Sequence, residues 1–209
     1  MSPDPTPRNS DDPSRAADFP RHYHDAGSDV PASIPDKATL QPVDLHGATT
    51  TEVDDVSWGW LRPPQPGAAG PYPSTILRRS ERTVSAILDV DERPTVVLEY
   101  LAVYHSNGAH RYLRDLRRAL EPGHGAGDRP GRWKILATCV AGPDSVLLRL
   151  REDIESAGGT KVRDTYVAVA RVGRLLVVVA DTGGKSCAAH RGLVEELIPP
   201  AVRRASVLL

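Results

Sequence analysis

The chain has 209 residues, of which 40% are hydrophobic and 25% charged, a composition typical of one globular domain with an appendage. Its formal charge of −1 excludes the basic domain that general nucleic-acid binding requires. The sequence has no apolar run of about 18 residues, so we expect no insertion into a membrane. Aromatic residues make up only 5% of the chain, and the core must therefore be built mainly from Val, Leu, Ile and Ala.

Residues 1–37 are predicted to form a disordered, acidic, proline-rich tail. Eight of the 19 prolines lie in the first 45 residues, together with eight acidic and four basic residues. Proline cannot continue a helix or donate a hydrogen bond to a sheet, and the segment has too few apolar residues to offset the entropy lost on ordering. It also lacks the basic start and apolar stretch of a secretory signal. We place the folded domain at residues 38–209.

The first part of this domain contains Trp58 and Trp60, followed by a stretch rich in proline and glycine from Arg62 to Pro73. Such a composition indicates a long surface loop. Loops of this length in compact domains tend to be functional or mobile.

From Ser74 onwards, strand and helix patterns alternate regularly. Two β-branched runs, 82–89 and 95–104, are predicted to form a hairpin. A helix then opens at residues 106–108 and ends before Pro122, with apolar residues on one side and arginines on the other. Four more strands (133–140, 145–151, 164–172 and 174–180) precede a helix at 186–197 that is interrupted at Pro199 and Pro200. Consecutive strands joined as hairpins indicate an α+β fold, in which helices pack on an antiparallel sheet.

The stretch from Arg82 to Leu197 resembles the PknH-like extracellular sensor domains of actinobacteria and the related secreted lipoproteins of the LpqN type. The resemblance rests on the strand 95–104, the helix 108–120, the segment 141–149 and the hairpin 166–179. It implies a PsbP-like α/β sandwich with an open cleft, a sensing or ligand-binding role outside the cytoplasm, and no catalytic residues. Such domains commonly carry a cysteine just after the first long helix, where this chain has Glu121, Pro122 and Gly123.

We therefore expect a non-catalytic, sensor-like domain that binds a small ligand or a cell-envelope component in this cleft, without a cofactor or metal. Ligand clefts combine aromatic and polar side chains, and the candidates are Asp55, Trp58, Trp60, Tyr104 and His105. The alternative is an enzyme, of the isomerase or cyclase type in an actinobacterial biosynthetic pathway, that uses the same cleft. For the two tryptophans a structural alternative also exists, namely that they cover the open edge of the sheet.

The arginine-rich side of the first helix is a candidate surface for an acidic partner. The arginines on it are Arg111, Arg114, Arg117 and Arg118, and Asp115 is the one acidic residue among them. The structural alternative is a solvated helix face.

Cys139 and Cys187, the two cysteines of the chain, either form one disulfide or serve as two small apolar side chains. The resemblance implies a location outside the cytoplasm, whereas a cytoplasmic location follows if the chain is complete without a signal. The segment from Asp181 to Ser186 follows a strand, as a phosphate-binding loop does, but Val179 stands where that motif needs glycine. A glycine-rich turn into a helix is therefore favoured for this segment.

Overall fold

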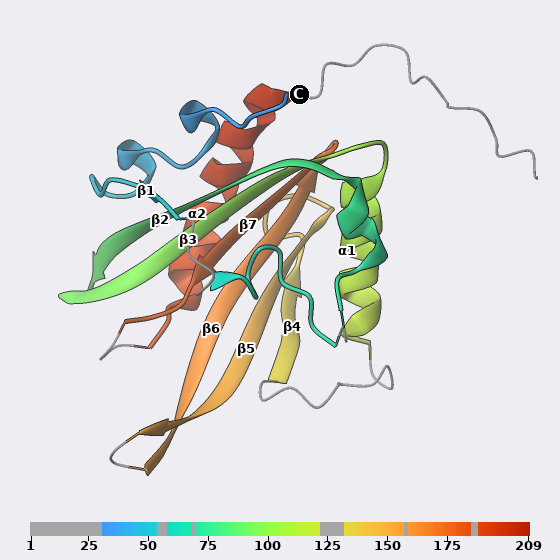
Figure 1. Ribbon diagram of the computed structural model, residues 1–209. Helices are drawn as coiled ribbons and strands as arrows, with labels where there is room; N and C mark the ends of the chain where they lie inside the picture. The colour runs from blue at the N-terminus through green and yellow to red at the C-terminus, as the bar shows by residue number, and fades with distance from the viewer. Residues whose placement is uncertain (1–30, 54–57, 68–69, 122–131, 157–158, 185–187) are drawn as a thin grey trace, which may run out of the picture.

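The computed structural model describes residues 31–53, 58–67, 70–121, 132–156, 159–184 and 188–209. Within them, seven strands form one antiparallel sheet in the order β1-β2-β3-β7-β6-β5-β4 (Figure 1). The strands are β1 (Thr51–Glu52), β2 (Arg78–Val90), β3 (Arg93–Tyr104), β4 (Arg132–Thr138), β5 (Ser145–Ser156), β6 (Gly159–Val172) and β7 (Leu175–Asp181). The helices are α1 (Gly108–Ala119) and α2 (Arg191–Ala205), with short 3-10 turns at Asp36–Ala38, Pro42–Asp44, Pro73–Leu77 and Ser206–Leu208. This architecture confirms the predicted α+β class.

The two helices cover opposite faces of the sheet (Figure 1). In β3, Val97 and Leu101 join the apolar cluster that contains α2, whereas Leu98 and Ala102 join the cluster that contains α1. Successive side chains of a strand point to opposite faces, so a strand between two helical layers is mainly apolar on both faces, with Glu99 as the charged exception in β3. This explains why the run 95–104 is apolar on both sides and not on one side alone.

The longest hairpin, β5–β6, extends beyond the strands predicted at 145–151 and 164–172 (Figure 1). Its outer part carries charged residues, which pair across the strands: Arg151 with Asp164 at 2.9 Å and Arg163 with Glu152 at 3.1 Å. Charged side chains obscure the apolar alternation by which a strand is recognised. Cross-strand ion pairs of this kind stabilise the hairpin without apolar burial.

The predicted end of the last helix at the two prolines is wrong. Helix α2 continues through Pro199 and Pro200 to Ala205. Proline weakens a helix interior because it removes a hydrogen bond and crowds the preceding turn. Here the apolar face of α2 lies on the sheet both before and after the prolines, with Leu197 and Ala201 fully buried, and this packing offsets the local cost.

The folded part also begins earlier than the predicted boundary at residue 38. Ile34 is only 4% exposed, and its carbonyl accepts a hydrogen bond from Nη1 of Arg82 at 2.9 Å. The hydroxyl of Ser80 donates to the carbonyl of Pro31 at 3.1 Å. Residues 31–37, which we assigned to the tail, therefore pack on β2. The rest of the predicted tail, residues 1–30, lies outside the described residues.

The start of α1 depends on a close approach at Gly108. A Cβ atom at this position would lie 2.7 Å from Cδ1 of Tyr104 and 2.8 Å from Cβ of Leu77. We expect Gly108→Ala to lower the free energy of unfolding by about 1–3 kcal/mol, as overpacking does in well-packed cores. Gly192 is the matched control, since nothing lies within 4 Å of its Cβ position in α2. Gly192→Ala should be neutral or stabilising by up to ~1 kcal/mol, and urea unfolding of both variants checks the pair. Equal stabilities would contradict the tight contact.

Candidate functional site

The proline-rich segment that carries the two candidate tryptophans lies over the core on the α1 face of the sheet. Trp58 and Trp60 are both half-buried and pack against the apolar cluster of this face. The ring of Trp60 meets that of Trp133 edge-on, with 6.2 Å between the ring centroids. Trp133 belongs to β4, the last strand of the sheet. The structural alternative, that the tryptophans cover the open edge, therefore holds for Trp60.

The described part of this segment is not the surface loop that its composition indicates. Leu61 is fully buried, and the hydroxyl of Tyr72 donates to the carbonyl of Pro66 at 2.9 Å. From α1, the hydroxyl of Tyr112 donates to the carbonyl of Pro64. The backbone carbonyls of the prolines are thus satisfied by buried tyrosines, and the segment covers the core in place of lining an open cleft.

The other candidates from the sequence do not converge on one cavity. Tyr104 is completely buried, and its hydroxyl has no hydrogen-bond partner among the described residues. Burial raises the pKa of this hydroxyl well above its usual range, although nearby Arg78 works against the shift. His105 is exposed, and its backbone N–H donates to the carbonyl of Leu77 at 2.8 Å. Asp55 lies outside the described residues. A ligand role for these five residues stays a prediction.

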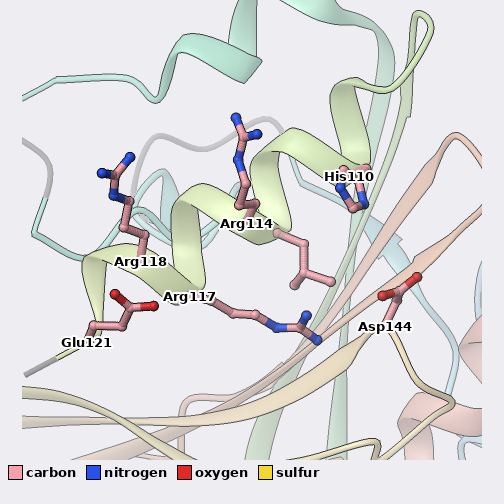
Figure 2. Close-up of a pocket in the computed structure, with 7 residues that line it drawn as sticks. His110, Arg114, Arg117, Arg118, Glu121 and Asp144 are labelled. Atoms are coloured by element: carbon pink, nitrogen blue, oxygen red, sulfur yellow. The ribbon is translucent and has the colours of Figure 1, made fainter.

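A pocket of about 420 Å³ lies instead on the flank of α1, where the helix faces the turn between β4 and β5 (Figure 2). It is lined by His110, Leu113, Arg114, Arg117, Arg118, Glu121 and Asp144. All of these except Asp144 come from α1 or the residues just after it, at spacings of three and four. Residues so spaced lie on one side of a helix.

The carboxylate at one side of the pocket is already neutralised. Asp144 forms an ion pair with Arg171 of β6, whose Nε lies 3.0 Å from Oδ2. The backbone N–H of Arg171 also donates to the carbonyl of Asp144 at 2.8 Å. Asp144 is therefore held in place by β6, and its charge is unavailable to the arginines of α1.

The arginines of the pocket are weakly paired. Arg114 approaches Asp115 at 3.8 Å, near the outer limit for an ion pair. Within the part of the chain that the structure describes, Arg117 and Arg118 make no ion pair; Arg117 contacts the carbonyl of Pro143 at 3.5 Å. Figure 2 shows the side chain of Arg117 extending toward Asp144, whereas those of Arg114 and Arg118 project from the helix in another direction. The site therefore presents guanidinium groups that can bind an anion.

The pocket only partly coincides with the predicted arginine face. Arg114 and Arg118 line it, but Arg111 is exposed one turn away and does not. Arg117, which the sequence places on the same side of the helix, also lines the pocket. We missed His110 and Asp144. His110 could have been found from its helical spacing with Arg114. Asp144 comes from a turn more than twenty residues along the chain, and no sequence spacing brings it to α1.

Asp181, at the end of β7, organises the glycine-rich loop that follows. It is fully buried, and Oδ1 accepts hydrogen bonds from the hydroxyl of Thr95 and, at 2.8 Å, from the N–H of Gly183. Its Oδ2 accepts the N–H of His190 at 2.6 Å and lies 3.4 Å from Nδ1 of the same residue. Both oxygens thus hold the loop to the start of α2. This favours the glycine-rich turn, although Lys185 and Ser186 lie outside the described residues.

The remaining candidates give no second site. Cys139 is exposed, and Cys187 lies outside the described residues, so their disulfide stays a prediction. Among the described residues, no three His, Cys, Asp or Glu side chains are grouped so that they could hold a metal ion. No helix in the described ranges is long and apolar enough to cross a membrane.

Neither the protein-family models nor the curated proteins include a match to this chain. The resemblance to PknH-like sensor domains therefore stays a prediction from the sequence. The functional argument depends on the geometry of the α1 pocket.

Proposed function

We propose that this domain is a non-catalytic, sensor-like binding module whose ligand is a small polar anion held in the α1 pocket. The observation that carries the proposal is the pocket itself, about 420 Å³ in volume and lined by three weakly paired arginines. Pockets for small molecules typically measure about 300–1,000 Å³. Arginine is the residue best suited to hold carboxylate and phosphate groups, because its planar fork donates two parallel hydrogen bonds.

The lining favours a polar ligand over a lipid chain. Leu113 is the one apolar residue among the seven that line the pocket. An apolar chain placed there would cover charged side chains without replacing their hydrogen bonds to water, which is unfavourable. A cell-envelope component would therefore bind through an anionic group.

The same lining supports binding more than catalysis. Arginine stays protonated at every physiological pH and does not exchange protons with a substrate. The tryptophans and Tyr104, which the enzyme alternative requires, do not line this pocket. An isomerase or cyclase of that type would need an acid or base beside these aromatic side chains.

A thermal-shift screen tests the proposed function. We expect at least one class of anion among uronic acids, acidic amino acids, hydroxy acids and phosphate esters, each at 5 mM and constant ionic strength, to raise the melting temperature. A ligand at ten times its dissociation constant stabilises by ~1.4 kcal/mol, which corresponds to about 3–5 °C for a domain of this size. Arg117→Gln should reduce the shift by half or more, whereas Arg111→Gln should retain it.

Glutamine suits both variants, because it is nearly as good a helix former as arginine. Arg117 lies near the C-terminal end of α1, where a cation stabilises the helix by about 0.3–1 kcal/mol. The melting temperature of each variant without ligand therefore provides the baseline. If no compound shifts the wild-type protein, or if the shift is as large in Arg117→Gln as in the wild-type protein, the pocket is not the binding site.

A further inference from the structure

We propose that the ligand of the α1 pocket carries a phosphate dianion, bound by Arg114, Arg117 and Arg118, on a small hydroxylated body. This inference rests on the proposed function and names the class of its ligand. It depends on three features of the pocket: the number of guanidinium groups, the positions of the two carboxylates, and the volume.

The three arginines offer more N–H donors than a single carboxylate can accept. Three arginines at positions i, i+3 and i+4 of α1 line one pocket, and each guanidinium carries five N–H donors in a rigid fork. One fork forms two parallel hydrogen bonds to a carboxylate, which has about four lone-pair sites in all, so three forks exceed its capacity. A phosphate group has three terminal oxygens and a charge of about −1.5 to −2 at neutral pH, so it can engage more than one fork at the same time.

The local charge also favours a dianion. Asp144 is neutralised by Arg171, which leaves Glu121 as the other acidic residue of the lining. Arg114 shares part of its charge with Asp115 at 3.8 Å, while Arg117 and Arg118 have no ion pair among the described residues. The positive charges of the three arginines exceed the negative charges of Glu121 and Asp115, so the pocket and its rim have a net positive charge.

The two carboxylates occupy opposite ends of the pocket. Figure 2 shows Glu121 beside Arg118 at the C-terminal end of α1 and Asp144 at the other end, below His110. Glu121 repels a phosphate, whereas Asp144 is neutralised by Arg171, so we place the phosphate away from Glu121, over Leu113 and Arg117. Hydroxyl groups on the rest of the ligand can then donate to the carboxylates at the ends.

The volume indicates that phosphate is only part of the ligand. A pocket of about 420 Å³ is far larger than an inorganic phosphate ion. The remaining space suits a short polyol or a monosaccharide. A phosphorylated polyol can come from a lipid headgroup or from a free sugar phosphate, and both share the chemistry that the pocket recognises.

Calorimetric titration at constant ionic strength and pH 7.5 tests the inference with inorganic phosphate and acetate. We expect phosphate to bind with a dissociation constant in the millimolar range and at least tenfold more tightly than acetate. Arg117→Gln and Arg118→Gln should each weaken phosphate binding at least fivefold. Arg111→Gln, on the same helix but outside the pocket, should change it less than twofold.

Two further ligands test which hydroxylated group the phosphate of the ligand is attached to. Glycerol 3-phosphate, which represents a lipid headgroup, and glucose 6-phosphate, which represents a free sugar phosphate, should compete with inorganic phosphate, and one of them should bind at least tenfold more tightly. Affinity equal to that of inorganic phosphate for both would overturn the proposed hydroxylated body.

The outcomes separate the inference from the proposed function. If acetate binds as tightly as phosphate, or if carboxylates bind and phosphate does not, the proposed phosphate dianion is wrong, whereas the proposed anion-binding module is retained. An equal loss in Arg111→Gln and Arg117→Gln would show diffuse attraction to a basic helix face and overturn the site. If none of the compounds binds, both proposals fail.

Discussion

Replacing Glu99 with glutamine is expected to stabilise the protein strongly at pH 9 and to leave its stability nearly unchanged at pH 4. Glu99 lies in the middle of β3 on the face toward α2 and is only 2% exposed. Its Oε2 accepts the backbone N–H of Leu40 at 2.7 Å, whereas Oε1 has no hydrogen-bond partner among the described residues. A buried carboxylate with one partner is unfavourable in its charged form.

Burial raises the pKa of Glu99 from 4.5 to about 8, against the hydrogen bond from Leu40, and the charge of Asp44 adds to the increase. Between these two pH values the folded protein retains a proton that the unfolded chain releases. The stability contributed by protonated Glu99 is therefore complete below pH 4.5 and is lost as the pH rises to about 8. The loss amounts to roughly 3–5 kcal/mol, at 1.36 kcal/mol per pKa unit.

Urea unfolding of the wild-type protein and Glu99→Gln at pH 4, 7 and 9 measures this effect. Glutamine resembles the protonated acid, so the variant should lack this part of the pH dependence. Glu152→Gln is the control, because Glu152 pairs with Arg163 near the surface of the β5–β6 hairpin and should matter by less than ~1 kcal/mol. If Glu99→Gln shows the same pH dependence as the wild-type protein, Glu99 does not titrate as the structure indicates.

Replacing Asp181 with alanine is expected to destabilise the protein by about 3–5 kcal/mol, as the removal of one partner from a buried charged network does. Its two oxygens accept hydrogen bonds from Thr95, Gly183 and His190, and the side chain is completely buried. Alanine removes the acceptor of these three donors in a fully buried site. The loop between β7 and α2 should lose the link to β3 that Asp181 makes through Thr95.

Two further variants keep this prediction testable if Asp181→Ala fails to fold. Thr95→Val removes one donor together with its requirement for an acceptor and should cost about 1 kcal/mol. Asp164→Asn changes a carboxylate that pairs with Arg151 near the surface, and it should cost less than ~1 kcal/mol. An Asp181→Ala protein as stable as Asp164→Asn would contradict the proposed role of Asp181.

The sheet and α1 could be predicted because their patterns are local. The apolar run of β3 follows from the order of residues along that strand. The pattern of α1, with apolar residues on one side and arginines on the other, follows from the order of residues along that helix. The continuation of α2 through Pro199 could not be predicted, since it depends on burial against a sheet that other segments build. The ordering of residues 31–37 depends in the same way on contacts with Ser80 and Arg82.

The site was harder to predict than the fold, for a related reason. Aromatic residues beside a proline-rich stretch suggested a cleft, but in the structure Trp60 packs on Trp133 and Tyr104 is completely buried. Large apolar rings gain most from burial, and a core poor in aromatic residues leaves them few other partners. The arginines of α1 were visible in the sequence. Their pocket was not, because Asp144 and Arg171 complete it from other elements.

The most direct test of the binding module is to observe the arginine side chains while the ligand binds. We suggest a titration with glycerol 3-phosphate, followed by the NMR signals of the arginine Nε–H groups at constant ionic strength. The Nε–H signals of Arg114, Arg117 and Arg118 should shift together and saturate with one dissociation constant, while that of Arg111 stays in place. Shifts that do not saturate, or that are as large at Arg111 as at Arg117, would contradict a specific anion site on α1.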